Sequence, residues 1–291
     1  MSGQQFLNTL SLSSKKVLVV GGTSGIGEAI ATKFASLGAS VTIAGRSEKA
    51  ATQIISDFNK SDFEKKGSLD FKQVDVSLVS NCKKFSKEVA SNSYDYIVLS
   101  AGMMRMGGRN ETSEGLDDKM ALHYYSRFTL IQELAPLLAK KSDGRILSVL
   151  AAGQGHLVDE NDLDLKNNYG VKQCADSCTL YNDLMVESFS KAYPTVGFTH
   201  AFPGFVNTPL ANGNKMPWFI KAPLSLITPL FSRTPEQCAT YLLSSFLDEE
   251  HKTGWHLMGQ NGEPVKLSAS HTEAVRQRVW DFTVNLIGKF P

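Results

Sequence analysis

A glycine-rich turn near the N-terminus constrains the fold of this chain more than any other feature. An apolar run over residues 16–20 is followed by Gly21-Gly22-Thr23-Ser24-Gly25-Ile26-Gly27, which opens a predicted helix over about 25–37. Glycines let the backbone approach a pyrophosphate closely, and the free N–H groups at a helix N-terminus attract phosphate oxygens. In this strand–turn–helix context the motif indicates a dinucleotide-binding α/β fold. The residues of the turn expected to contact the cofactor are Gly21, Thr23, Ser24, Gly25, Ile26 and Gly27.

Further strands and helices alternate along the chain. Helices are predicted over about 113–138 and 172–192, and the predicted strands after the first cover 40–44, 71–74, 94–100, 145–150 and 196–202. Strands that alternate with helices form a parallel sheet covered on both faces, and right-handed crossovers make it doubly wound. The 291 residues, 42% of them hydrophobic, suffice for one large core. We therefore expect a single Rossmann-like domain over residues 1–291.

Composition excludes several other classes. The net charge of +1 gives no basic face, so no nucleic-acid partner is expected. No apolar stretch is long enough to span a bilayer, and residues 1–16 show no signal-peptide pattern. Cys174 and Cys178 share a predicted helix face without the further ligands that a metal site needs, so all four cysteines are expected to be reduced thiols and no metal is expected. A cytoplasmic location fits these features.

A segment after the sixth predicted strand stands out in composition. Residues 216–231 are rich in Trp, Phe, Leu and Ile and are interrupted by Pro217, Pro223 and Pro229. Apolar loops beside a crevice often cover it, so residues 210–232 are a candidate substrate lid, and an ordinary packed insertion is the alternative.

The second predicted strand carries information on cofactor choice. It ends at Ala44 and is followed by Gly45 and Arg46, where an acidic residue would bind the ribose 2′-hydroxyl of NAD. Arg46 can pair with a 2′-phosphate instead, so NADP(H) is the expected cofactor.

These motifs together resemble the classical short-chain dehydrogenases/reductases over nearly the whole chain. Gly21, Gly25 and Gly27 match the family's TGxxxGxG glycines, although Val20 stands where Thr is usual. Asp75-Val76, Ser100-Ala101-Gly102 and Pro203-Gly204-Phe205-Val206-Asn207-Thr208 resemble its later cofactor segments. The resemblance implies further cofactor contacts from Asp75, Val76, Ala101, Gly102, Pro203, Gly204, Val206 and Thr208.

The resemblance also implies an Asn, Ser, Tyr and Lys catalytic set, which this chain does not match. The Asn position falls on His123 and the Ser position on Ala151. Ungapped counting back from Pro203-Gly204 places the Tyr position on Gln173 and the Lys position on Ser177. The chemistry that the family performs with these four residues must therefore be altered or absent here.

Two other registers could supply a tyrosine. Tyr181 has Met185 where the Lys should be, which argues against it. Tyr169 and Lys172 are three residues apart and would share a helix face, so a shift of one turn could rebuild the pair. The alternative is that Tyr169 is a loop aromatic and Lys172 a solvated residue.

The predicted function is that of an NADP(H)-dependent oxidoreductase with a non-standard acid/base, acting on a small apolar carbonyl or alcohol. Candidate proton donors are Tyr169, with Lys172, and His123, expected to titrate near neutral pH, besides Tyr124 and Tyr125. The alternatives are a non-redox enzyme of cyclase or isomerase type and a catalytically silent NADP-binding protein. The sequence is compatible with a homo-oligomer.

Overall fold

A parallel sheet of seven strands organises the computed structural model, which describes residues 2–157, 159–208 and 233–291. Its order is β3-β2-β1-β4-β5-β6-β7, so the strand sequence reverses direction between β1 and β4. The predicted α/β, Rossmann-like doubly wound fold is confirmed. The strands are β1 Lys16–Val20, β2 Ser40–Gly45, β3 Ser68–Gln73, β4 Tyr96–Leu99, β5 Gly144–Val149, β6 Val196–Ala201 and β7 Gly254–Met258.

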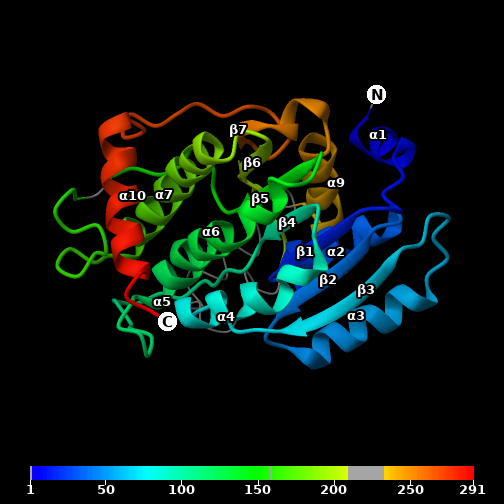
Figure 1. The fold of residues 1–291 in the computed structure, drawn as a ribbon, viewed down its shortest axis with the longest axis horizontal. Coiled ribbons are helices and arrows are strands. Elements are labelled where there is room, and N and C mark those ends of the chain that lie inside the picture. Colours follow the sequence, from blue (N-terminus) through cyan, green and yellow to red (C-terminus); the bar gives the residue numbers. More distant parts are fainter. Residues whose placement is uncertain (1, 158, 209–232) are drawn as a thin grey trace.

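Helices cover both faces of the sheet (Figure 1). One face carries α1 (Gly3–Thr9), α2 (Gly25–Ser36), α3 (Glu48–Lys60) and α9 (Pro235–Phe246). The other carries α4 (Val79–Val89), α6 (Ser126–Leu138), α7 (Val171–Ala192) and α10 (Glu273–Ile287). Shorter pieces are η1 (Ala90–Asn92), α5 (Asp118–Met120), η2 (Ala121–Tyr125) and η3 (Glu249–Lys252).

The central strands are apolar because both of their faces are covered. In β1 all residues except Lys16 are buried, and they pair in register with β2 on one side and β4 on the other. Residues of β5 and β6 are buried along their whole length. Such continuous burial is typical of a parallel sheet. Because the strands run in the same direction, the carboxyl ends of β1, β4, β5 and β6 lie at one edge.

The helix expected over 113–138 begins later than predicted. Asp117 caps it, because its carboxylate accepts hydrogen bonds from the N–H groups of Lys119 and Met120. The next residues, Ala121–Tyr125, form a π-helical turn before α6 continues. Such wide turns are rare and occur frequently at functional sites.

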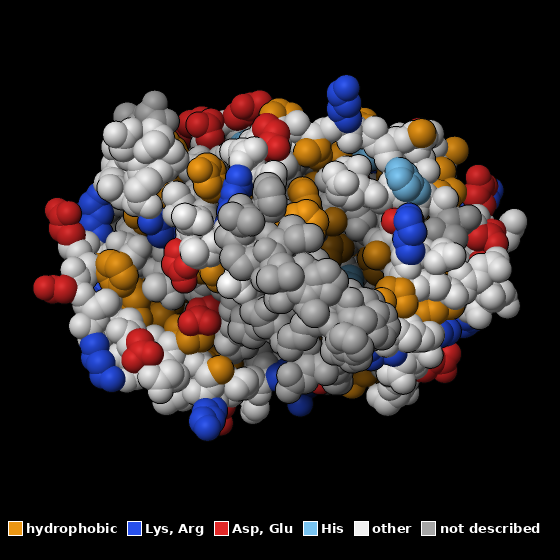
Figure 2. Space-filling view, turned by 180° about the vertical axis from the view of Figure 1, so that it is seen from behind, with side chains coloured by type: hydrophobic (Ala, Val, Ile, Leu, Met, Phe, Trp, Pro, Cys, Tyr) orange, Lys and Arg blue, Asp and Glu red, His pale blue; other side chains and the backbone are white. Residues whose placement is uncertain are grey.

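The structure also bears on the expected thiols, on helices that could span a membrane and on the distribution of charge. All four cysteines are buried and free. Within the described ranges no helix has the length and apolar character that crossing a bilayer requires, and no group of three His, Cys, Asp or Glu side chains could hold a metal. Acidic and basic side chains are interspersed on the face in Figure 2. The candidate lid over 210–232 lies outside the described residues.

Candidate functional site

A cleft of about 270 Å³ opens at the carboxyl edge of the sheet, beside the point where the strand order reverses. Ligands of open α/β sheets bind at this place. Its lining includes these residues of the predicted set: Gly21, Ser24, Gly25, Ile26, Arg46, Asp75, Val76, Ala101, Gly102 and Thr208. Residues predicted from five separate segments of the chain therefore meet around one cavity.

The glycine turn is shaped by close backbone contacts. Gly21 has φ +84°, and a Cβ there would lie 2.4 Å from the backbone nitrogen of Ala101. A Cβ on Gly27 would lie 2.2 Å from the carbonyl oxygen of Gly21. Larger residues are thus excluded at both positions, which brings the start of α2 against the end of β1.

The N-terminus of α2 is open toward the cleft. Ser24 occupies the N-cap position, but its side chain makes no capping hydrogen bond. Gly25, at the first helical position, has φ +58°. The free N–H groups and positive dipole end of a twelve-residue helix suit an anion such as pyrophosphate.

Arg46 stands at one end of the cleft, directly after β2. It is exposed, and its side chain has no ion-pair or hydrogen-bond partner among the described residues. Asp75, which also lines this end, accepts a hydrogen bond from the N–H of Ser77. The guanidinium is therefore available to an anionic ligand, and these residues fit the adenosine half of a phosphorylated dinucleotide.

The loop after β6 closes the opposite end. Gly204 has φ +73°, and the Pro203 carbonyl accepts a hydrogen bond from the buried thiol of Cys238. Val206 forms an isolated bridge with Arg233, and Thr208 reaches the cleft. Five residues of the predicted set do not line the cleft themselves but lie in its glycine turn and in this loop: Thr23, Gly27, Pro203, Gly204 and Val206.

His123 lies beside the cleft on the π-helical turn. Its Nε2 accepts a hydrogen bond from the N–H of Met103 at 2.9 Å. Burial, assisted by the positive charges of Arg127 and Lys119, lowers its pKa to about 3. The expectation that His123 titrates near neutral pH is wrong, because its surroundings disfavour the charged ring, and it cannot donate a proton from Nε2 at neutral pH.

The three residues that the sequence resemblance places at the family's Ser, Tyr and Lys positions include no proton donor suited to neutral pH. Ala151 follows β5 and offers only its backbone, whose N–H donates to His200. Gln173 is exposed in the first turn of α7. Ser177 is completely buried, and its hydroxyl has no partner among the described residues.

Tyr169 and Lys172 do not share a helix face. Helix α7 begins after Gly170, whose backbone is extended, so Tyr169 precedes the helix. Lys172 is exposed and pairs with Asp176 one turn further on. The spacing argument for a rebuilt pair assumed an earlier helix start, and this arrangement does not support it.

A different lysine lies near Tyr169. The Nζ of Lys119 is 5.2 Å from the centre of the tyrosine ring. The Tyr169 hydroxyl is buried and has no hydrogen-bond partner among the described residues. Burial, then Cys174 and Asp117, raise the pKa of Tyr169 above its ordinary value, so the phenol is protonated at neutral pH.

The other three candidate tyrosines are packed in the core. Tyr181 is buried in the middle of α7, and its hydroxyl donates to the carbonyl of Leu163 at 3.1 Å. Tyr124 pairs with Thr283 at 2.9 Å, and the hydroxyl of Tyr125 is buried without a partner in the described ranges. Burial raises the pKa of all three phenols.

Sequence reasoning missed the buried arginine on α6. Arg127 is 2% exposed, and its Nη1 donates to the Ser148 hydroxyl at 2.7 Å and to the Val149 carbonyl at 2.9 Å. Asn182 accepts from the same hydroxyl and donates to the carbonyl of His123. A charged residue beside Phe128, Leu130 and Ile131 in the predicted helix was the available signal.

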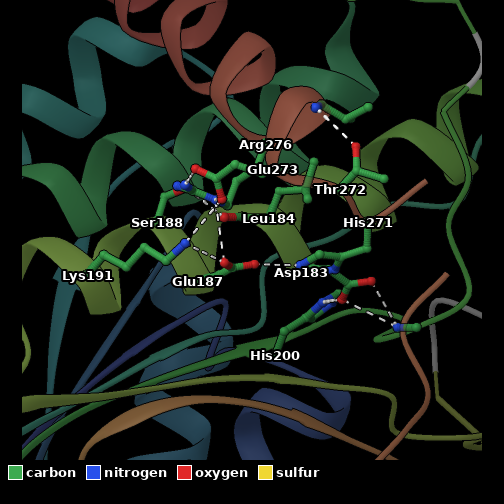
Figure 3. A network of polar contacts seen from close by, with 12 residues as sticks. Asp183, Leu184, Glu187, Ser188, Lys191, His200, His271, Thr272, Glu273 and Arg276 are labelled. Carbon is green, nitrogen blue, oxygen red and sulfur yellow. Dashed lines mark hydrogen bonds and ion pairs between the residues drawn. The ribbon is translucent and has the colours of Figure 1, made fainter. Parts of the chain in front are cut away.

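Also missed was a fully buried pair below the end of β5. Asp183 on α7 and His200 on β6 are in hydrogen-bond contact, and Asp183 also accepts from the N–H of Gly153 (Figure 3). Further along α7, Glu187 contacts His271 and Lys191 and lies 3.5 Å from Arg276 of α10. This network ties the floor of the site to the C-terminal helix.

Comparisons with known proteins agree with this architecture. A family profile described as short chain dehydrogenase matches residues 15–156. Oxidoreductase AN1596 of Emericella nidulans is 35% identical over 202 residues, which cover 68% of this chain and 60% of that protein. Oxidoreductase andH of Emericella variicolor is 31% identical over 228 residues, 76% of this chain and 66% of that protein. The chain thus spans about three fifths to two thirds of these relatives' length.

Solved structures share the fold. One is the 3-oxoacyl (acyl-carrier-protein) reductase of Agrobacterium tumefaciens C58, solved with NADP bound. It superposes with a TM-score of 0.66 at 18% identity, covering 87% of this chain and 96% of the reductase. At this identity the similarity concerns the fold alone.

Proposed function

We infer that the chain belongs to the short-chain dehydrogenase/reductase family, and on this premise we propose that it is an NADP(H)-dependent oxidoreductase acting on a small apolar carbonyl or alcohol. The observation that carries the proposal is the cleft between the open N-terminus of α2 and Arg46, whose side chain has no partner among the described residues. The relatives named as oxidoreductases support the reaction class.

Arg46 is the basis for NADP(H) over NAD(H). A guanidinium without an ion pair in the described ranges can bind a 2′-phosphate, whereas the position directly after β2 carries no carboxylate for a ribose diol. The pyrophosphate would lie on the N-terminus of α2, and Thr208 and Gly102 would flank the nicotinamide end. When bound, the reduced cofactor supplies a hydride for carbonyl reduction.

Carbonyl reduction also needs a proton, and we assign its delivery to Tyr169. Its hydroxyl is buried near Cys174 and Asp117 and is protonated at neutral pH. Lys119 lies near the ring and would stabilise the phenolate formed after proton transfer. A raised phenol pKa makes this donor weaker than the family's usual tyrosine, so turnover is expected to be slow.

A second candidate is a non-redox enzyme of cyclase or isomerase type, or a protein that binds NADP without catalysis. It is favoured by Ala151, Gln173 and Ser177, which replace the usual acid/base set. Loss of positioned acid–base catalysis typically lowers rates by about 10²–10⁴-fold.

NADPH oxidation on a panel of apolar ketones and aldehydes separates the candidates. The proposal predicts slow but measurable consumption that Tyr169→Phe lowers, while NADPH affinity is unchanged. Stoichiometric NADPH binding with no oxidation of any panel member would instead favour the non-redox or silent alternatives.

A further inference from the structure

The guanidinium of Arg127 holds together the ends of two neighbouring strands. Its Nη2 donates to the carbonyl of Ala101, directly after β4, at 2.9 Å. Its Nη1 donates to Ser148 and Val149 at the end of β5. The third nitrogen, Nε, is buried without a partner in the described part of the chain. The positive charge is therefore fixed at the carboxyl edge of the sheet.

This charge has no carboxylate partner. Among the described residues no Asp or Glu oxygen lies within ion-pair distance of Arg127. The residues outside the described ranges, 1, 158 and 209–232, include no Asp or Glu. The nearby buried carboxylate Asp183 is occupied by His200 and the N–H of Gly153. A buried and unpaired cation is costly to the folded state, which suggests a functional role.

The charge of Arg127 lies beside the half of the cleft that is lined by Ala101. Arg46 and Asp75 lie over β2 and β3, at the end assigned to the adenosine half of the cofactor. The cofactor must then extend across β1 toward Ala101, Gly102 and Thr208. Because Arg127 bonds to the carbonyl of Ala101, its charge lies behind this second wall of the cleft, where the nicotinamide belongs.

We propose that Arg127 biases the cleft toward the reduced cofactor, NADPH, over NADP⁺. The proposal rests on the proposed function, which it deepens by assigning the direction of the reaction. The nicotinamide ring of NADP⁺ carries one positive charge that NADPH lacks, so a fixed cation behind the cleft wall repels the oxidised form alone. Low-dielectric surroundings strengthen this repulsion. Tight binding of NADPH and easy release of NADP⁺ suit a reductase.

The test is the ratio of the dissociation constants of NADP⁺ and NADPH, measured by titration calorimetry at fixed salt concentration. The wild-type protein is expected to bind NADPH more tightly, and Arg127→Gln is expected to lower the ratio about tenfold, mainly by tightening NADP⁺. Arg127→Lys keeps the charge and should retain most of the ratio. Affinity for 2′,5′-ADP, which lacks nicotinamide, should not change in either variant.

Arg145→Gln is the matched control. Arg145 is equally buried but pairs with Asp143 at the opposite end of β5, so its loss should leave the ratio unchanged. A wild-type ratio at or below one overturns the proposal even if Arg127→Gln fails to fold. So does a folded Arg127→Gln protein with the wild-type ratio. Absence of binding by both cofactor forms would instead overturn the proposed function together with this inference.

Discussion

The Nδ1 atom of His200 lies 2.6 Å from Oδ1 of Asp183, and Nε2 of the same ring accepts a hydrogen bond from the N–H of Ala151 at 3.2 Å. Because Nε2 is an acceptor, the ring proton sits on Nδ1 and is donated to the carboxylate. Both side chains are fully buried. The pair joins α7 and β6 (Figure 3), and through the N–H of Ala151 it fixes the backbone where the sequence resemblance implies the family's serine.

Removing the carboxylate of this pair should destabilise the protein. In Asp183→Ala, the His200 Nδ1–H and the N–H of Gly153 lose their acceptor inside the core, which we expect to cost about 2–4 kcal/mol of unfolding free energy. Asp183→Asn retains an acceptor oxygen and should cost less. Urea unfolding measures both. Equal stability of Asp183→Ala and wild type would show that the pair is not structural.

Acid should weaken the hydrogen bonds and ion pairs of Asp143, at the opposite edge of the sheet. Burial opposes ionisation of Asp143, but hydrogen bonds from Tyr96, Arg145 and Lys15 outweigh it and lower the pKa from 3.8 to about 2. The ionised group therefore stabilises the folded state fully above its unfolded pKa, and this contribution is lost as the pH falls through the folded pKa. Allowing for solvent screening, we expect about 1–2 kcal/mol.

The comparison with Asp143→Asn isolates this effect. The difference in unfolding free energy between the two proteins should be largest near pH 6 and should shrink as the pH falls from about 4 to about 2. A difference that stays constant over this range would contradict the assignment.

Two tyrosines should respond differently to loss of their hydroxyl. Tyr169→Phe should lower turnover by about a hundredfold without weakening NADPH binding, because its hydroxyl is assigned to proton delivery. Tyr181→Phe should lose only the bond to Leu163, with a stability cost of about 1 kcal/mol and unchanged turnover. A selective loss of turnover in Tyr181→Phe, with normal folding, would restore the register that places the catalytic tyrosine there.

The sequence was sufficient to predict the fold and to bring together most residues of the candidate cleft, because short sequence patterns determine both. Apolar strands such as β1 are buried on both faces, and Gly27 is required by a backbone contact with Gly21 inside the turn. The cleft residues meet because parallel strands end at one edge of a sheet.

The acid/base chemistry could not be predicted because it depends on the start of helices and on burial. The extended backbone of Gly170 begins α7 after Tyr169, and this separates Tyr169 from Lys172. The low pKa of His123 results mainly from its burial, with smaller contributions from Arg127 and Lys119, and this burial depends on tertiary packing that periodicity does not reveal. The contact between Lys119 and Tyr169 likewise joins residues far apart in the sequence.

Titration of NADPH and NADH into the wild-type protein and Arg46→Ala tests the central claim most directly. The account predicts that NADPH binds wild type at least about tenfold more tightly than NADH, and that Arg46→Ala abolishes this preference by weakening NADPH alone. Arg278→Ala, which removes an exposed arginine paired with Glu160 instead, should retain the preference. Equal affinity of wild type for the two cofactors, or a preference that survives in Arg46→Ala, would contradict the account.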